Sequence, residues 1–367
     1  MRRRRFIRAA LAAGAGLPVA SLSGCGFLEA FVEALARSCP SDPAESGGVD
    51  WTPDVLHPVF YGYQDFTAAS GAPGAVRVWY PTYEGFTAGP PILKLCLVRW
   101  PVVLFLHGQP PCPDANYYRR WTLLPAVLAR SGYVVVVPSH GAGLPGDVSS
   151  PEVANALGYI DWVRTSWEHA RWVDARPEAT AVAGHSYGAL LAARVAQARP
   201  SISAFVGLSG PWTELGNPVP ALQAIGAPSF FMWGTGDPIT GAFESLDGGG
   251  LWNQVPAPKH AGVFPGLHFD YLSPWAGCSF SRETCTLIGA AAAELTALFI
   301  SRYAPVSLSA SDIPVTLDPP DVTLTQKQQF FAGGHLNGLK QMKTRSGCSL
   351  SLRWVDGAQT GSRQLGP

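Results

Sequence analysis

Apolar runs of strand length alternate along this chain with segments of helical periodicity, and this alternation restricts its fold more than any other feature. The mostly apolar runs lie at 75–80, 101–106, 133–137, 179–184, 204–208 and 229–233. Segments with helical spacing lie at 121–131, 152–167, 189–198 and 285–303. Continuous apolar runs are typical of strands buried on both faces. Strands that alternate with helices form a mainly parallel sheet covered on both faces, so the sequence predicts an α/β fold.

Length and composition allow one large domain with an appendage, or two modest domains. Of the 367 residues, 47% are hydrophobic and 14% are charged, which is enough apolar material for a sizeable core. We predict that residues 56–303 form the main domain. Beyond residue 303 the chain turns rich in Pro, Ser, Thr and Asp and then alternates in short runs such as 350–354. Residues 304–367 are therefore expected to form a small β-rich C-terminal extension.

One short motif lies between a predicted strand and a predicted helix. Gly184-His185-Ser186-Tyr187-Gly188 begins at the end of the apolar run 179–184 and directly precedes the predicted helix 189–198, which is rich in small residues. A strand, a sharp Gly-x-Ser-x-Gly turn and a helix together form the context of a nucleophile elbow, in which a strained turn exposes the serine Oγ. The glycines are needed because side chains at those positions would clash. We predict Ser186 as a nucleophile; a glycine-rich turn without chemistry is the alternative.

A serine hydroxyl needs a base to act as a nucleophile near neutral pH. With an elbow of this kind, the acid and then the histidine follow in chain order on loops after later strands. Asp237 follows the predicted strand 229–233, and His268 lies between a glycine and the last long helix. These two are the predicted partners of Ser186. Asp247 is the alternative acid; His260, beside a lysine, is the alternative base but is expected at the surface.

An oxyanion hole requires two backbone N–H groups aimed at the developing negative charge. The first predicted donor is Tyr187, directly after the nucleophile and at the positive end of the following helix. The second should come from the loop after the run 101–106. Pro110 and Pro111 carry no N–H, so Gln109 is the predicted donor and Gly108 the alternative.

These segments together resemble the α/β-hydrolase superfamily over residues 56–303. The matching features are Val102–Gly108, Pro138-Ser139-His140, the elbow, Asp237 and His268, with Arg77-Val78-Trp79-Tyr80-Pro81 near the start. Within the superfamily the pattern is similar to chlorophyllase-like, platelet-activating-factor-acetylhydrolase-like and dienelactone-hydrolase-like esterases and to cutinase-like polyester hydrolases.

This resemblance implies a serine esterase or lipase that forms an acyl-enzyme on Ser186 and needs no metal or organic cofactor. Amide or peptide cleavage and acyl transfer would use the same triad. Haloalkane and epoxide chemistry is disfavoured because those relatives carry Asp at the elbow. A catalytically inactive, surface-anchored binding module is the alternative from another class.

Several aromatic residues have two possible roles. His140 either lines the cleft or is structural. The other candidates either form the wall of an apolar acyl site or pack in the core: Trp212, Trp233, Trp252 and Phe269.

The first residues resemble an export signal. Arg3-Arg4-Arg5-Phe6-Ile7-Arg8 is similar to a twin-arginine motif, and the uncharged stretch 9–22 is shorter than the roughly 20 residues of a membrane span. Leu22-Ser23-Gly24-Cys25 resembles a lipobox, which predicts lipid attachment to Cys25. We therefore expect a signal peptide at 1–24, an amphipathic segment and linker at 25–55, and a lipoprotein of the cell envelope or a secreted protein.

The charge of the mature chain bears on its partner, and its cysteine content agrees with export. Removing five leader arginines from 26 basic residues leaves 21 against 26 acidic ones, a net charge near −5, which argues against a nucleic-acid partner. The expected partner is a small-molecule or lipid-like ester, with the membrane reached through Cys25. Apart from Cys25, six cysteines could form three disulfides in an oxidising compartment, with Cys278–Cys285 the favoured pair.

Overall fold

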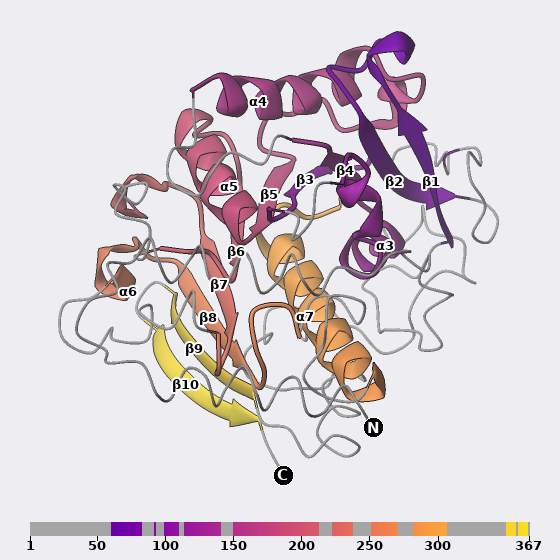
Figure 1. Ribbon diagram of the computed structural model, residues 1–367. Helices are drawn as coiled ribbons and strands as arrows, with labels where there is room; N and C mark the ends of the chain where they lie inside the picture. The colour runs from indigo at the N-terminus through magenta and orange to yellow at the C-terminus, as the bar shows by residue number, and fades with distance from the viewer. Residues whose placement is uncertain are drawn as a thin grey trace, which may run out of the picture. The chain divides into compact units, whose positions relative to one another are not determined.

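The protein is an α/β structure built on one ten-stranded sheet (Figure 1). The computed structural model describes residues 60–82, 92, 99–109, 114–140, 150–212, 222–237, 251–270, 282–306, 350–356 and 359–365. All of these belong to one compact unit, Pro40–Pro367. The predicted signal peptide, Cys25 and Asp247 lie outside the described residues. Within the described part, no helix has the length and apolar content that crossing a membrane requires.

The strand order across the sheet is β1-β2-β4-β3-β5-β6-β7-β8-β9-β10. The strands are β1 (Phe60–Phe66), β2 (Val76–Thr82), β3 (Val102–Leu106), β4 (Val134–Pro138), β5 (Thr180–His185), β6 (Ala204–Leu208), β7 (Ser229–Gly234), β8 (Lys259–Phe264), β9 (Leu350–Asp356) and β10 (Gln359–Leu365). Pairing is parallel from β4 through β8 and antiparallel at both ends. The predicted parallel sheet is therefore confirmed as the centre of a mixed sheet.

Helices cover both faces of the sheet. They are α3 (Leu123–Arg130), α4 (Ser150–Thr165), α5 (Tyr187–Ala198), the single-turn α6 (Leu251–Gln254) and α7 (Arg282–Tyr303). Helices α4 and α5 pack together on one face, and α3 and α7 pack together on the other (Figure 1). Every side chain of β3 is fully buried between these layers, as its continuous apolar sequence predicts.

The C-terminal strands belong to the same sheet. Strands β9 and β10 form an antiparallel hairpin, and β9 pairs antiparallel with β8, the last parallel strand. The guanidinium of Arg353 on β9 lies 5.4 Å from the ring centroid of Trp252. The tail thus contains the β-structure expected from its alternation, and its described strands extend the central sheet.

His260 is buried, so its prediction as a surface residue was wrong. It is fully shielded on β8, with its ring 5.3 Å from that of Phe299 on α7. Pairing with both β7 and β9 makes β8 an interior strand, and even the neighbouring Lys259 is buried, donating from Nζ to the carbonyl oxygen of Trp252 (2.6 Å). Burial, together with the charge of Arg302, lowers the pKa of His260 to about 3.

A buried neutral histidine makes the fold sensitive to acid. The unfolded chain binds a proton at His260 near pH 6.5 and the folded protein only near pH 3. Stability therefore falls as the pH drops below 6.5, by up to about 1.4 kcal/mol per pH unit for this group. In urea titrations, His260→Gln should reduce the difference in unfolding free energy between pH 7 and pH 5 by about 2 kcal/mol. An unchanged difference would contradict this account.

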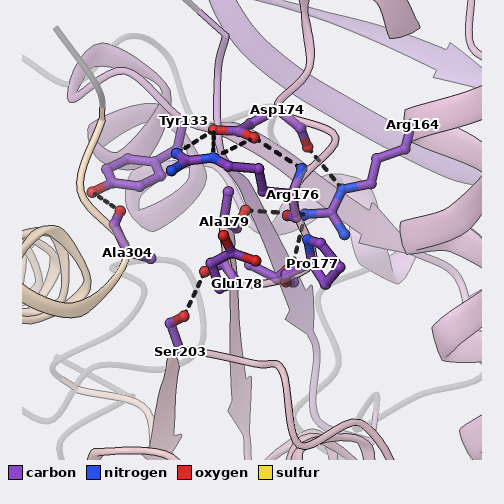
Figure 2. Close-up of polar contacts among 10 residues, drawn as sticks. Tyr133, Arg164, Asp174, Arg176, Pro177, Glu178, Ala179, Ser203 and Ala304 are labelled. Atoms are coloured by element: carbon purple, nitrogen blue, oxygen red, sulfur yellow. Dashed lines mark hydrogen bonds and ion pairs between the residues drawn. The ribbon is translucent and has the colours of Figure 1, made fainter.

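Arg164, near the end of α4, organises the loop that leads into β5 (Figure 2). Its guanidinium donates hydrogen bonds to the carbonyl oxygens of Asp174 (3.0 Å), Arg176 (2.9 Å) and Ala179 (3.2 Å), and to Thr180 Oγ1 (2.6 Å). Burial would raise the pKa of Asp174, but its hydrogen bonds and ion pair with Arg176 hold that pKa below the usual value. These contacts set where β5, the strand that ends at the elbow, begins.

Replacing Arg164 should destabilise the protein. Arg164→Met keeps most of the aliphatic stem but removes the hydrogen bonds to the carbonyl oxygens of Asp174, Arg176 and Ala179, and we expect a loss of about 2 kcal/mol in unfolding free energy. The matched control is Arg171→Met, at an exposed position over the Trp172 ring, which should change stability by less than about 1 kcal/mol. Equal effects of both substitutions in chemical denaturation would contradict the role assigned to Arg164.

Candidate active site

Ser186 joins β5 to α5 in a strained turn. Its φ is 54°, in the left-handed region that few residues other than glycine adopt. The Ser186 N–H donates to the carbonyl oxygen of Leu208 on the adjacent β6 (2.8 Å), and its side chain is half-buried. The turn therefore has the geometry expected of an elbow, with Ser186 at the carboxyl edge of the sheet.

The two glycines of the motif are required by close backbone packing. A Cβ on Gly184 would overlap the carbonyl oxygen of Gly188, and a Cβ on Gly188 would overlap the carbonyl oxygens of Leu106 and His107. The start of α5 therefore lies directly against the end of β3. This agrees with the sequence argument that side chains at these positions would clash.

Substitution of Gly188 should be far more damaging than substitution of a glycine on a helix surface. Gly188→Ala places a methyl group inside the backbone of β3, and we expect a loss of at least about 3 kcal/mol in unfolding free energy. Gly158→Ala on α4 is the control, because its Cβ would meet only Pro73 Cγ at 4.0 Å. That change should stabilise the protein by roughly 0.5–1 kcal/mol. Thermal and chemical denaturation of both variants would measure the contrast.

Asp237 and His268 form a buried pair. His268 Nδ1–H donates to both carboxylate oxygens of Asp237, at 3.1 Å and 3.0 Å. The His268 side chain is 4% exposed and the Asp237 side chain 0%. The contact directs the opposite ring nitrogen of His268, Nε2, away from the carboxylate. The structure thus brings together the acid and the base predicted from the sequence.

Backbone hydrogen bonds bring the two loops of this pair side by side. Beyond the parallel ladder of β7 and β8, Thr235 N–H donates to Phe264 O (2.7 Å) and Gly236 N–H donates to Gly266 O (2.8 Å). Asp270, also buried, accepts a hydrogen bond from Leu267 N–H at Oδ2 (2.8 Å) and closes a tight turn around His268. The positions of Asp237 and His268 therefore follow from strand pairing.

The loop after β3 lies beside the nucleophile. A Cβ on Gly108 would stand 2.9 Å from Ser186 Cβ. His107 Nδ1–H donates to the carbonyl oxygen of Gly108 (2.7 Å). Since the C=O and N–H of a trans peptide point in opposite directions, this bond sets the direction of the Gln109 N–H. Gln109 directly follows Gly108 in the chain, and its role as an oxyanion donor to a substrate at Ser186 stays a prediction.

Tyr187, the other predicted donor, is the first residue of α5. Its backbone N–H is one of the first four of the helix, which lack an intrahelical partner. Its side chain is buried, and its hydroxyl donates to Glu152 Oε1 on α4 (2.9 Å). Helix α4 therefore helps to hold the start of α5.

The aromatic candidates divide between the site and the core. His140 lies close to the site, with its ring stacked 4.0 Å from that of His107. Phe269 contacts His268 edge-on at 4.8 Å. The three tryptophans are buried, and Trp212 packs against Phe205 and Phe231 of the core.

Two buried histidines that sequence reasoning did not single out adjoin the site. Burial lowers the pKa of both His107 and His185 well below 6.5, so both rings are neutral near pH 7. Each has one ring nitrogen within hydrogen-bond distance of a backbone carbonyl oxygen, Gly108 O and His268 O respectively. Both histidines belong to sequence segments already identified, His185 to the elbow motif and His107 to the run that ends at Gly108. Their roles could not be predicted, because they depend on contacts between loops.

Ser186 and His268 lie on neighbouring loops without a direct bond between them. Within the described ranges, Ser186 Oγ makes no hydrogen bond to His268; such contacts are often long before substrate binds.

Among the described residues, no group of three or more His, Cys, Asp or Glu side chains could hold a metal ion. The disulfide prediction falls on cysteine side chains outside the described residues.

Comparison with known families agrees with the fold. A model of the alpha/beta hydrolase family matches residues 103–335, which include the elbow, Asp237 and His268. The chain belongs to the alpha/beta hydrolase family. A search of the curated proteins finds no match for this hydrolase.

Proposed function

We propose that this hydrolase cleaves carboxylic esters through an acyl-enzyme formed on Ser186, with His268 as the base and Asp237 as its acid partner. The observation that carries the proposal is the buried His268–Asp237 pair at 3.0 Å on the loops beside a strained serine elbow. Family membership supports hydrolysis, and the resemblance to esterases of the chlorophyllase-like and cutinase-like branches supports an ester substrate.

In the first half-reaction, His268 Nε2 accepts the proton of Ser186 Oγ as Oγ attacks the ester carbonyl carbon. The tetrahedral intermediate carries its negative charge on the former carbonyl oxygen, which the Tyr187 and Gln109 N–H groups stabilise. His268 then donates the proton to the leaving alcohol oxygen as the C–O bond breaks. Asp237 keeps the imidazole in the required tautomer and supports its positive charge.

In the second half-reaction, water replaces the alcohol. His268 takes a proton from water, the hydroxyl oxygen attacks the acyl carbon, and the same N–H groups stabilise the second oxyanion. Return of the proton to Ser186 Oγ releases the carboxylic acid and restores the enzyme. Amide cleavage would use the same groups, but an amine is a poorer leaving group than an alcohol and depends more strongly on protonation by His268.

Esterase activity should depend on Ser186. The mature protein should hydrolyse p-nitrophenyl esters in the series from acetate to palmitate, and Ser186→Ala should lower kcat by about 10⁴-fold or more. The chain-length profile would report the size of the acyl site. If neither protein turns over these esters but a fluorophosphonate labels Ser186 in the parent, the triad is active on another substrate. Absence of both turnover and labelling would favour a binding module.

Replacing the acid, Asp237, should lower kcat and have little effect on KM. Asp237→Asn preserves the shape of the side chain but not its charge, and it leaves His268 in the wrong tautomer, so we expect kcat to fall by about 10⁴-fold. Asp161→Asn on α4, where Asp161 forms an exposed ion pair with Arg199 at the end of α5, is the matched control and should retain parental kcat and KM. Full activity of Asp237→Asn would assign the acid role to another residue.

We also propose that the protein is exported and anchored to the membrane through a lipidated Cys25, with residues 1–24 removed. The twin-arginine-like and lipobox-like segments support this proposal. In cell fractionation, the parent should be found in the membrane fraction and Cys25→Ala should not. Substitution of Arg3 and Arg4 by lysine should retain the precursor inside the cell. Equal distribution of all three proteins would contradict this anchoring.

A further inference from the structure

Three site loops meet on one buried imidazole, that of His185. This residue precedes Ser186 at the end of β5, and its side chain is fully buried. We propose that His185 is a positioning residue that holds the main chain of His268 beside Ser186 through a hydrogen bond from its ring. The inference rests on the proposed roles of Ser186 and His268 and assigns a residue that acts through the base.

The central contact joins two neighbouring loops of the site. His185 Nε2 lies 3.2 Å from the carbonyl oxygen of His268. A carbonyl oxygen can only accept, so Nε2 carries the proton and the neutral ring has its lone pair at Nδ1. Burial first, and then the nearby His268, keep the pKa of His185 well below 6.5. The ring of His185 therefore stays neutral near pH 7, with this donor in place.

The surroundings of the ring leave it little freedom. Its centroid lies 4.7 Å from the ring of His268, 5.0 Å from Phe269 and 5.1 Å from Trp121. A Cβ on Gly108 would stand only 2.8 Å from His185 Nδ1. The imidazole thus packs between the base loop, the loop after β3 and Trp121, which lies just before α3. A shift of any one of these segments would disturb the ring.

This contact complements the one made by Asp237. Asp237 binds the side chain of His268 and sets the direction of its ring, whereas His185 binds its backbone and sets where the residue lies. Because Ser186 is the next residue after His185, the hydrogen bond links the nucleophile to the base independently of the acid. Loss of the bond should therefore reduce productive alignment of Ser186 and His268 with little effect on substrate binding.

Two substitutions separate the hydrogen bond from the packing. His185→Phe keeps an aromatic ring of similar shape and removes the donor. His185→Gln removes the ring but can place an amide N–H where Nε2 lies. For p-nitrophenyl butyrate between pH 5 and 9, we expect kcat of His185→Phe to fall by about tenfold with KM nearly unchanged. His185→Gln should recover most of kcat, even if its melting temperature is lower.

Two results of the kcat measurements would contradict the positioning role of His185. Parental kcat in His185→Phe would overturn the proposal. The proposal would also be overturned if the loss of kcat in each variant simply followed its loss of thermal stability, because a role in packing alone predicts that correlation. Circular dichroism of each variant would provide the stability measurement.

A second readout does not depend on ester hydrolysis. The His268 Nδ1–H that bonds to Asp237 should give a downfield proton resonance in NMR spectra of the parent, and His185→Phe should weaken or broaden it while His185→Gln retains it. An unchanged resonance in His185→Phe would overturn the positioning role even if the esterase proposal holds. Failure of the esterase proposal alone would appear as an inactive parent whose resonance still responds to His185.

Discussion

Parallel pairing from β4 to β8 is the constraint on which the rest of the structure depends. Parallel strands end at the same edge of a sheet, so the segments after β3, β5, β7 and β8 emerge side by side. The β7–β8 ladder continues into the loops, which places Asp237 and His268 in contact. The β3–β5 register aligns Leu106 with Gly184, which brings the loop after β3, with the proposed oxyanion donor Gln109, to the same edge as the elbow. Each functional group thus owes its position to strand pairing more than to its own side chain.

Close approach of backbones at this edge explains the local sequence. Gly184 and Gly188 are free of side chains because carbonyl groups occupy the space that a Cβ would need. Gly234 meets the base loop in the same way, with the carbonyl oxygen of Gly266 where its Cβ would lie. In this compact arrangement, water is largely excluded from the His268–Asp237 pair, which strengthens its hydrogen bond. The neutral rings of His107 and His185 fill the remaining space without introducing charges that would compete with His268.

Local patterns predicted much of the fold and the central residues of the site. Apolar runs with their flanking turns identified β3 to β7, since strands buried on both faces are apolar along their length. Strand β1, which is half-exposed with mixed polarity, gave no comparable signal. His260 was misplaced because a neighbouring lysine suggested an exposed segment, whereas pairing of β8 with β9 from the distant C-terminus buries both residues. No local pattern reports a strand partner about ninety residues away.

The sequence by itself determined the α/β class, the elbow at Ser186 and the candidates Asp237 and His268, because each depends on periodicity or on short-range turn chemistry. Only the tertiary structure decided which loops touch. The contact of His185 with the backbone of His268, the bond that orients the Gly108–Gln109 peptide, and the tether from Tyr187 to Glu152 all join segments from different strands or helices, or set a loop's direction in space. Such contacts arise from the packing of distant segments, which leaves no periodic trace in the residues that make them.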